Sequence, residues 1–561
     1  MFLPFVGGLV YNLGRFDDIW YGLFEMQERC VNDGAILVKR LSTTVIIVVV
    51  CLVLLPVDVS GAGLSIEGGW FVHDGAVVWG LGQHNGWWGG YRKSGGWIDQ
   101  YKVRTAICRN ALGRVGPSYT EDLDKLTDAM LEFGYPGFEH NFGLWYDRRR
   151  DGHDAGRRTD GNVEPPYLEQ PWARSGEGTA WDGLSKYDLT KFNRWYFDRL
   201  REFAGLCDKK GTILFHNFYM QHTLLETPAH YVDYPWRGVN CVQETGMPDA
   251  LPAANAFYDL SDETRRELHR IYIYKCLDEL GDYTNVIHLI GEEYTGPVSF
   301  MRFWIDTVGR WERERGRKVK LGLVGTKDVV DAILEDPARG AMVSTICLSY
   351  WWYNGDGTLY APQGGKEVPG RYTGELPKNT TPESLYRQIR EYRLRYPDKA
   401  IIQHHPAEIE KAWAFLMGGG SMIIARMQYA DSQPPKKPWD PPDSYIAPPE
   451  SEIILPTYDF INAHLASVLP RMRPDDVAVR DGDSNWCLSD GKDNYLIFAL
   501  AGGRIELDLS EASKGPFTAR WFDPRKGGLI RLNDDKIMGG GQISVETPDE
   551  QCWVLWLRCR R

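Results

Sequence analysis

The sequence lacks several features that would define its chemistry directly. None of its ten cysteines forms a CxxC pair or stands at zinc-finger spacing with a histidine, so no zinc motif is present. Positive charge is in deficit, because 64 Lys and Arg face 76 Asp and Glu for a net charge of −12. A protein that binds nucleic acid needs a basic face, so that class is excluded. We expect no cofactor, no metal site and no nucleic-acid partner.

Long apolar runs are also missing after residue 63. The run Val45–Val57 is shorter than the roughly 20 residues of a membrane span. It follows Lys39 and Arg40 and precedes small residues, which is the pattern of a signal peptide. We predict that residues 1–62 are a signal peptide whose true start lies downstream of Met1; a retained signal anchor is the alternative. The remaining chain is then secreted or periplasmic, with no stable membrane span.

Disulfides are not dictated by the cysteine spacing. An exported chain permits them, and Cys487 with Cys552 or Cys559 is a candidate pair. Buried free thiols are the alternative. In neither case does cysteine chemistry predict the function.

Aromatic residues are abundant. The chain has 21 Trp and 29 Tyr, which is more than a core of this size requires. Flat aromatic rings stack on the C–H faces of sugars, so this composition suits a carbohydrate-binding protein. A secreted protein that is simply rich in Trp is the alternative.

Short apolar runs alternate with amphipathic stretches between residues 109 and 426, which is typical of βα units around a parallel sheet. The pattern predicts a closed (β/α)8 TIM barrel of the α/β class, because eight strands and seven intervening helices leave no ninth unit. The eight predicted strands are Ala111–Gly116, Gly137–Tyr146, Thr212–Tyr219, Asn285–Ile290, Val319–Val324, Met342–Leu348, Ala400–His404 and Met422–Ala425.

Three further segments surround the predicted barrel, which we place at residues 109–470. Residues 63–108 are a β element that leads into it, with a hairpin turn at His73-Asp74-Gly75. Pro434–Pro449 contains seven prolines and is a linker or a surface excursion. Residues 471–561 show a period of two between turns, which predicts a small antiparallel β-sandwich.

The strongest candidate for catalysis follows predicted strand four. Glu292 and Glu293 stand in Ile290-Gly291-Glu292-Glu293-Tyr294, at the strand end where barrel enzymes place their active sites. Hydrolysis of a glycosidic bond needs a carboxyl that donates a proton and a second that acts as nucleophile or base. We expect Glu293 ahead of Glu292 to be the proton donor; a solvated pair that caps the next helix is the alternative.

Polar residues also end predicted strands two and three. Glu139, His140 and Asn141 end the first of these and His216 and Asn217 lie in the second, where burial without a partner would be costly. We expect them to point into the barrel mouth and bond to sugar hydroxyls. The alternative is a polar layer whose members satisfy one another.

The loops after the strands supply a rim. We predict sugar contacts from its polar and aromatic side chains. For the aromatic triplet Trp351-Trp352-Tyr353, packing between loops is the alternative. These residues are Trp145, Asp147, Asp182, Lys327, Asp328, Trp351, Trp352 and Tyr353. Strand seven ends in Gln403-His404-His405 without a carboxylate, so Glu408 at the start of the next helix is a further catalytic candidate, or a partner of the helix dipole.

These motifs resemble a known family. The segments Glu139–Arg149, Ala180–Ser185, Glu293–Pro297 and Thr326–Val329 resemble exported bacterial proteins of unknown function that are related to clan A glycoside hydrolases. Residues 518–556 resemble the small collagen-binding β-sandwich appended to several such hydrolases.

The resemblance implies an acid/base Glu after strand four and a nucleophilic Glu after strand seven. Glu293 matches the first role, whereas Gln403-His404-His405 stands where the second is expected. Glu139 is then a substitute carboxylate. We predict a glycoside hydrolase that acts on an oligosaccharide or polysaccharide. The alternatives are a barrel that binds sugar without cleaving it and a polysaccharide lyase with His140 or His216 as base.

Overall fold

The structure is a computed structural model. It describes residues 63–84, 123–140, 145–146, 168–181, 183–225, 231–232, 234–292, 294–365, 380–404, 408–426, 447, 449–479, 484–532 and 537–560. Residues 62–561 are assigned to one compact unit.

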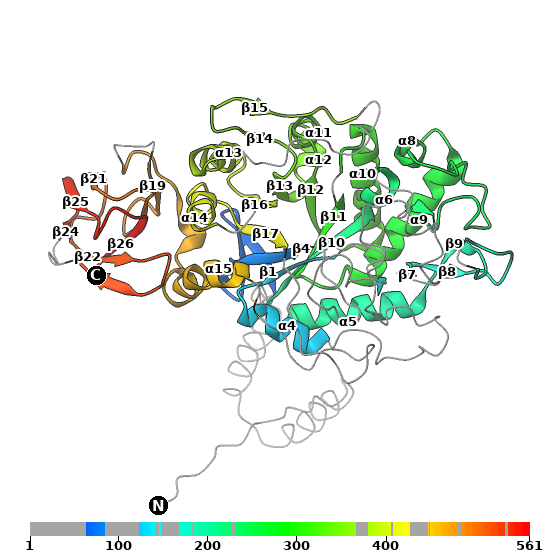
Figure 1. Ribbon diagram of the computed structural model, residues 1–561, viewed down its shortest axis with the longest axis horizontal. Helices are drawn as coiled ribbons and strands as arrows, with labels where there is room; N and C mark the ends of the chain where they lie inside the picture. Colours follow the sequence, from blue (N-terminus) through cyan, green and yellow to red (C-terminus); the bar gives the residue numbers. More distant parts are fainter. Residues whose placement is uncertain are drawn as a thin grey trace, which may run out of the picture. The chain divides into compact units, whose positions relative to one another are not determined.

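Eight parallel strands close into a barrel, as the alternation of apolar runs predicted (Figure 1). In barrel order they are β4 (Leu81–His84), β5 (Gly137–His140), β10 (Ile213–Met220), β11 (Val286–Glu292), β12 (Lys320–Val324), β13 (Val343–Cys347), β16 (Ala400–His404) and β17 (Met422–Arg426). The barrel closes where β17 pairs with β4 in parallel. The predicted fold class, a TIM barrel followed by a β-sandwich, is confirmed.

The first barrel strand is not the one that the sequence predicted. β4 lies within the segment assigned to the N-terminal element, and the predicted strand Ala111–Gly116 lies outside the described residues. β4 has only four residues and contains Gly82, so it offers no apolar run to detect. Gly82 is required by packing, because a Cβ there would stand 2.5 Å from the Ile424 side chain.

Helices cover the outside of the barrel. They are α4 (Leu123–Glu132), α5 (Arg194–Lys210), α9 (Glu263–Leu280), α10 (Val298–Arg315), α11 (Lys327–Leu334), α13 (Pro382–Arg395) and α14 (Ile409–Met417). Local signals set their ends: the Asn193 and Asp262 side chains cap α5 and α9, and Gly211 ends α5 at a φ of 72°. Helix α5 starts only at Arg194, because Tyr187–Phe192 before it forms β9, which pairs with β8 (Trp172–Arg174).

A three-stranded antiparallel sheet precedes the barrel. It contains β1 (Leu64–Glu67), β2 (Trp70–His73) and β3 (Ala76–Val77), and the predicted turn joins the last two. Its Leu64 and Phe71 pack into the same cluster as interior barrel residues such as Phe215 and Ile402. This small sheet therefore closes the N-terminal end of the barrel.

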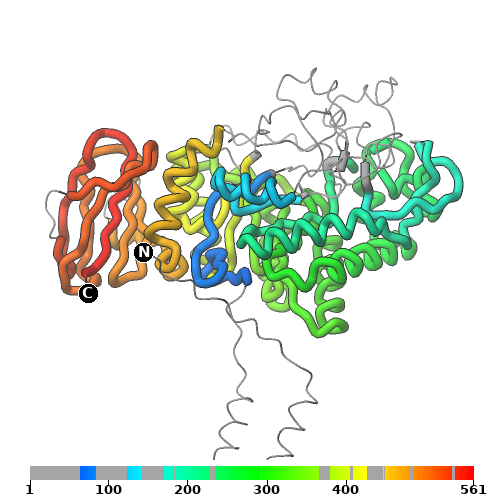
Figure 2. Tube along the Cα trace, turned by 90° about the horizontal axis from the view of Figure 1, so that it is seen from below, coloured from blue at the N-terminus to red at the C-terminus, as the bar shows by residue number. Residues whose placement is uncertain are grey.

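The C-terminal strands form two antiparallel sheets, within the part of the chain that runs from orange to red in Figure 2. The larger sheet contains β18 (Arg473–Pro474), β19 (Asn485–Ser489), β20 (Asn494–Ala499), β26 (Trp553–Cys559), β22 (Pro516–Phe522), β23 (Leu529–Arg531) and β24 (Ile537–Met538). The smaller sheet pairs β21 (Arg504–Asp508) with β25 (Gln542–Glu546).

Stacked aromatic rings join the sandwich to the barrel helices. Tyr386 of α13 stacks on Trp486 at 4.7 Å between ring centroids, and Trp413 of α14 stacks on Phe498 at 5.6 Å. Phe460, the last residue of α15 (Pro449–Phe460), stacks on Phe522 at 4.2 Å. All of these rings belong to the core cluster of the barrel. The sandwich thus shares a hydrophobic core with the barrel helices.

Candidate active site

Polar groups that lie on strands β5, β10 and β16 or directly after β13 meet at one end of the barrel. Glu139 comes from β5 and Asn217 from β10, while Ser349 and His404 come from just after β13 and from the end of β16. In TIM barrels this end carries the active site. These residues therefore define the candidate site.

Glu139 lies at the centre of this cluster. Its carboxylate is almost fully buried, with 1% of the side chain exposed. Asn217 Nδ2 donates to Oε1 at 3.1 Å, and His404 Nε2 lies 2.9 Å from Oε2. A buried carboxylate is stable only when its oxygens are bonded in this way, so the protein has built a position for a charged Glu inside the barrel mouth.

His404 links Glu139 to the strand β13 side of the mouth. Its Nδ1 lies 2.5 Å from Ser349 Oγ and 3.7 Å from Cys347 Sγ, and its backbone N–H donates to Ser349 Oγ at 3.0 Å. Although burial opposes the charged form, Glu139 and Cys347 hold the pKa of His404 well above its ordinary value. Contact with Glu139 thus favours the protonated form of the His404 imidazole.

The alternation of side chains along a strand explains which predicted residues reach the mouth. Glu139 and Asn217 point inward, as expected. Their neighbours His140 and His216 must point outward, and they stack on each other at 5.8 Å between ring centroids. His140 also contacts Tyr196 of α5 at 6.2 Å. The expectation that His140 and His216 face the sugar is therefore wrong; both are buried between strands and helices.

His288 of β11 extends this outer layer, with its Nδ1 3.4 Å from Nδ1 of His216. Burial lowers the pKa of His140 and His288 to about 3 and that of His216 well below its ordinary value. The three imidazoles are accordingly neutral packing groups, and neither His140 nor His216 is placed to act as a lyase base.

The residues predicted after strand five are committed to structural contacts. Lys327 Nζ bonds to Asp331 at 2.8 Å and to the Tyr392 hydroxyl at 3.1 Å, and it lies 4.7 Å from the Trp351 ring centre. Asp328 accepts from the Thr326 hydroxyl at 2.7 Å and from the backbone of Gly364. These contacts tie α11 to α13 and to the segment after β15 that contains Gly364.

The aromatic triplet after strand six packs between loops and helices, which is the alternative that the sequence left open. Trp351 is fully buried against Tyr392. Trp352 stacks on Tyr360 at 4.2 Å within the hairpin of β14 (Trp352–Tyr353) and β15 (Leu359–Tyr360). Tyr353 donates its hydroxyl to Glu391 at 2.8 Å. The two Trp rings, being covered, present no free face to a sugar.

Several predicted residues are not described by the structure. Asn141, Asp147, Asp182 and Glu293 lie outside the described residues, and so do the side chains of Glu292 and Trp145. Glu408 is the N-cap residue of α14, and its exposed carboxylate pairs with Lys411 at 3.2 Å.

The sequence alone did not identify His404 and Ser349 as site residues. Their only signal was their place at the ends of strands six and seven, where polar side chains meet the barrel mouth. The folded structure places Glu139 in contact with His404, although its strand lies more than 200 residues earlier in the chain.

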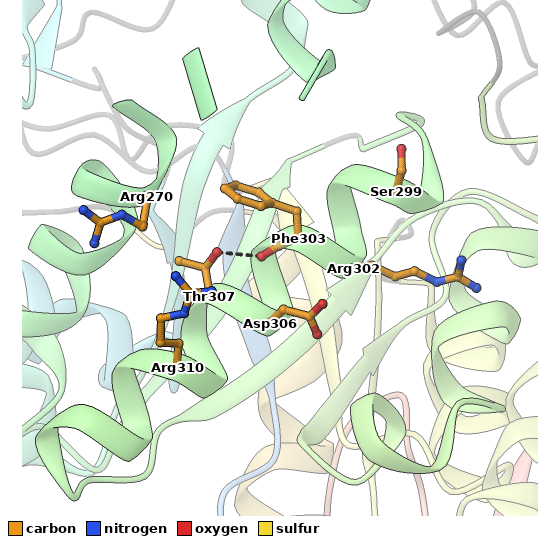
Figure 3. A pocket seen from close by; sticks show the side chains of 7 residues that line it. All are labelled: Arg270, Ser299, Arg302, Phe303, Asp306, Thr307 and Arg310. Carbon is orange, nitrogen blue, oxygen red and sulfur yellow. Dashed lines mark hydrogen bonds between the residues drawn. The ribbon is translucent and has the colours of Figure 1, made fainter. Parts of the chain in front are cut away.

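A shallow cavity of about 400 Å³ lies elsewhere, between α9 and α10 (Figure 3). Its polar lining includes Arg270, Arg302 and Asp306, and the two arginines point in opposite directions. Asp306 is already bonded to Arg339 at 2.7 Å. This cavity brings no carboxylate pair together and lies on helices, away from the strand ends.

Within the described ranges, no group of three or more His, Cys, Asp or Glu side chains is placed to hold a metal ion. Seven cysteines of the described part are free thiols, among them Cys487, Cys552 and Cys559, so the candidate disulfide is not formed there. No helix in the described segments is long and apolar enough to cross a membrane.

The described chain thus combines a closed parallel barrel, a buried carboxylate at the barrel mouth and a β-sandwich after the barrel. Residues 53–433 match the family described as "Domain of unknown function (DUF6298)", and the chain belongs to that family. Residues 478–558 match the family described as "Putative collagen-binding domain of a collagenase". The resemblance to a family of unknown function with an appended collagen-binding domain is confirmed.

Solved structures are similar in fold. One titled "Glycoside hydrolase" has a TM-score of 0.50 and 12% identity, and the match covers 89% of this chain and 97% of that one. A glycoside hydrolase family 5 protein from Bacteroides vulgatus has a TM-score of 0.49 and 11% identity, with 89% and 94% covered. No curated protein matches the chain. At 12% identity, the likeness to the first of these shows the fold alone.

Proposed function

We propose that this protein is an exported glycoside hydrolase that cleaves glycosidic bonds in an oligosaccharide or polysaccharide by a two-carboxylate mechanism. Glu293 is the proton donor in this proposal and Glu139 is the second carboxylate. The observation that carries it is the Glu139 carboxylate, bonded to Asn217 and His404 inside the barrel mouth. Glycosidases need such a carboxylate beside a proton donor.

The other candidates support this choice less well. Glu408 is exposed and paired with Lys411, so it lacks the partial burial that tunes a catalytic carboxyl. The lyase alternative loses both of its proposed bases, because His140 and His216 face the helices. Export is supported by the pattern around Val45–Val57 in the sequence.

The proposal is tested by incubating the purified protein with a panel of polysaccharides and aryl glycosides and following released sugar by chromatography. We expect the wild type to cleave at least one class. Glu293→Gln and Glu139→Gln should each lower kcat by a factor of about 100 or more, because each removes a carboxyl that takes part in bond cleavage.

Glu312→Gln is the matched control. Glu312 is a glutamate with 5% exposure on α10, bonded to Lys318 and to the backbone of Val319, away from the mouth. Its replacement should leave turnover unchanged. If the wild type releases no sugar but binds the same glycans in a titration, the sugar-binding alternative replaces the hydrolase.

A further inference from the structure

The end of strand β16 holds a histidine where the resemblance to clan A hydrolases places a carboxylate. His404 is the last residue of β16, and its ring crosses the mouth to Glu139 of β5 at 2.9 Å. β16 and β5 are not adjacent in the barrel, because β17 and β4 lie between them. The contact therefore spans the mouth and is not a by-product of strand pairing.

His404 is itself held in place on its other side. Ser349 Oγ stands 2.5 Å from Nδ1 and also accepts the backbone N–H of His404. The same hydroxyl lies 2.8 Å from Cys347 Sγ. Because Ser349 contacts both the ring and the backbone of His404, the orientation of the imidazole is fixed before any substrate binds.

The two side chains of the pair differ in how far they are exposed to solvent. The His404 side chain is 19% exposed, whereas Glu139 is 1% exposed. An isolated carboxylate at such a depth would lose its charge, because removing it from water costs several kcal/mol in practice. A cation in contact offsets that cost, and the raised pKa of His404 shows the reciprocal effect of Glu139 on the imidazole.

We propose that His404, fixed by Ser349, positions Glu139 and keeps its carboxylate charged, so that a His–Glu pair across the mouth replaces the carboxylate expected at the end of strand seven. His404 is a positioning residue here, and Glu139 is the group that acts on the sugar. The inference thus rests on the proposed function.

Two titratable groups face His404 from other strands in the described part. Glu139 approaches from β5 and Cys347 from the end of β13, with the neutral Ser349 between the thiol and the ring. Glu139 is the acid that contacts the ring, so the replacement of that one side chain tests the pair.

The first test compares pH–rate profiles of the wild type and His404→Gln on the glycan that the wild type cleaves. Gln keeps an N–H that can bond to Glu139 but removes the positive charge. We expect kcat to fall about 100-fold with KM unchanged. The acidic limb of the profile should shift toward higher pH by about one unit or more, because Glu139 loses the cation that favours its ionised form.

Two further variants separate positioning from general damage. Ser349→Ala removes the contact on Nδ1 but leaves the pair with Glu139, so kcat should fall while the acidic limb stays in place. His73→Gln is the matched control, because His73 has the same 19% side-chain exposure but lies at the other end of the barrel beside Asp74. It should change neither quantity. A profile for His404→Gln that coincides with the wild type overturns the proposal.

The second test needs no substrate. The His404 imidazole is titrated by NMR in the full protein, with its signal assigned from His404→Gln. It should keep its proton to a higher pH than a free imidazole, whose pKa is about 6.5, and should lose it at lower pH in Glu139→Gln. Titration that is the same with and without Glu139 overturns the pairing. If the titration shows the expected dependence on Glu139 but the wild type cleaves no glycan, the pair stands and the proposed hydrolase activity is contradicted.

Discussion

Residues on the barrel strands differ in charge state according to the face of the strand on which their side chains lie. Glu139 and His404 form an ion pair inside the mouth, whereas His140, His216 and His288 are neutral rings outside it. Sequence neighbours thus differ in charge state, because strand alternation sends one side chain to the polar mouth and the next to an apolar layer.

The outer histidines make stability depend on acid. An unfolded His takes up a proton near pH 6.5, whereas folded His140 and His288 resist it down to about pH 3. The unfolding free energy should therefore be fully present above pH 6.5 and fall as the pH drops below it, by about 1.4 kcal/mol per pH unit for each such histidine.

The substitution His140→Phe removes one of the histidines that take up a proton on unfolding. The fall in unfolding free energy between pH 7 and pH 4.5, measured by urea denaturation, should be smaller than in the wild type by about 2 to 3 kcal/mol. Identical falls in both proteins would show that His140 accepts its proton in the folded state.

At the scale of elements, one arginine attaches the N-terminal sheet to the barrel. Arg393 of α13 is almost fully buried and donates to the backbone oxygens of Gly69, Pro397, Lys399 and Gly419. Gly69 is the turn between β1 and β2, and a Cβ there would clash with the guanidinium at 1.4 Å. The sheet, the helix and the start of β16 are therefore joined through one side chain.

Arg393→Met should lower the unfolding free energy by about 3 to 5 kcal/mol, because it leaves several buried carbonyl oxygens without a donor. Arg390→Met is the control: Arg390 lies on the same helix but is partly exposed and pairs with Asp476 at the surface, where an ion pair is worth about 1 kcal/mol or less. Equal losses in chemical denaturation would refute the role given to Arg393.

At the scale of the whole described unit, the barrel and the sandwich share one hydrophobic core. The stacked pairs Tyr386–Trp486, Trp413–Phe498 and Phe460–Phe522 bury large rings from both sides. The sandwich also has a second cluster of its own, which includes Phe517 and Trp521. It is thus both a small domain and a cover for the helices α13–α15.

Calorimetry should show one cooperative unfolding transition for barrel and sandwich together. Phe522→Ala removes a ring from the shared core and should destabilise the whole by about 3 to 5 kcal/mol without splitting the transition. Phe517→Ala, in the separate cluster of the sandwich, is the comparison. Two separate transitions in the wild type would mean that the shared core does not couple the parts.

The sequence alone determined the strand and helix alternation, the barrel and the sandwich, because apolar periodicity is a local signal. Seven of the eight barrel strands were predicted near their observed bounds; β4 escaped because its four residues include a glycine and carry no apolar run. The sequence also identified Glu139 and Asn217 as groups at the strand ends.

Only the tertiary structure decided which polar residues meet. Successive side chains of a strand point to opposite faces, and only the folded barrel shows which of them face the mouth. Glu139 and Asn217 face the mouth, whereas their neighbours His140 and His216 face the helices. Trp351 and Trp352 became packing groups because helix α13 and the β14–β15 hairpin cover them. The pair of His404 with Glu139 exists because closure of the barrel brings together strands that are 265 residues apart, and no local pattern records that distance.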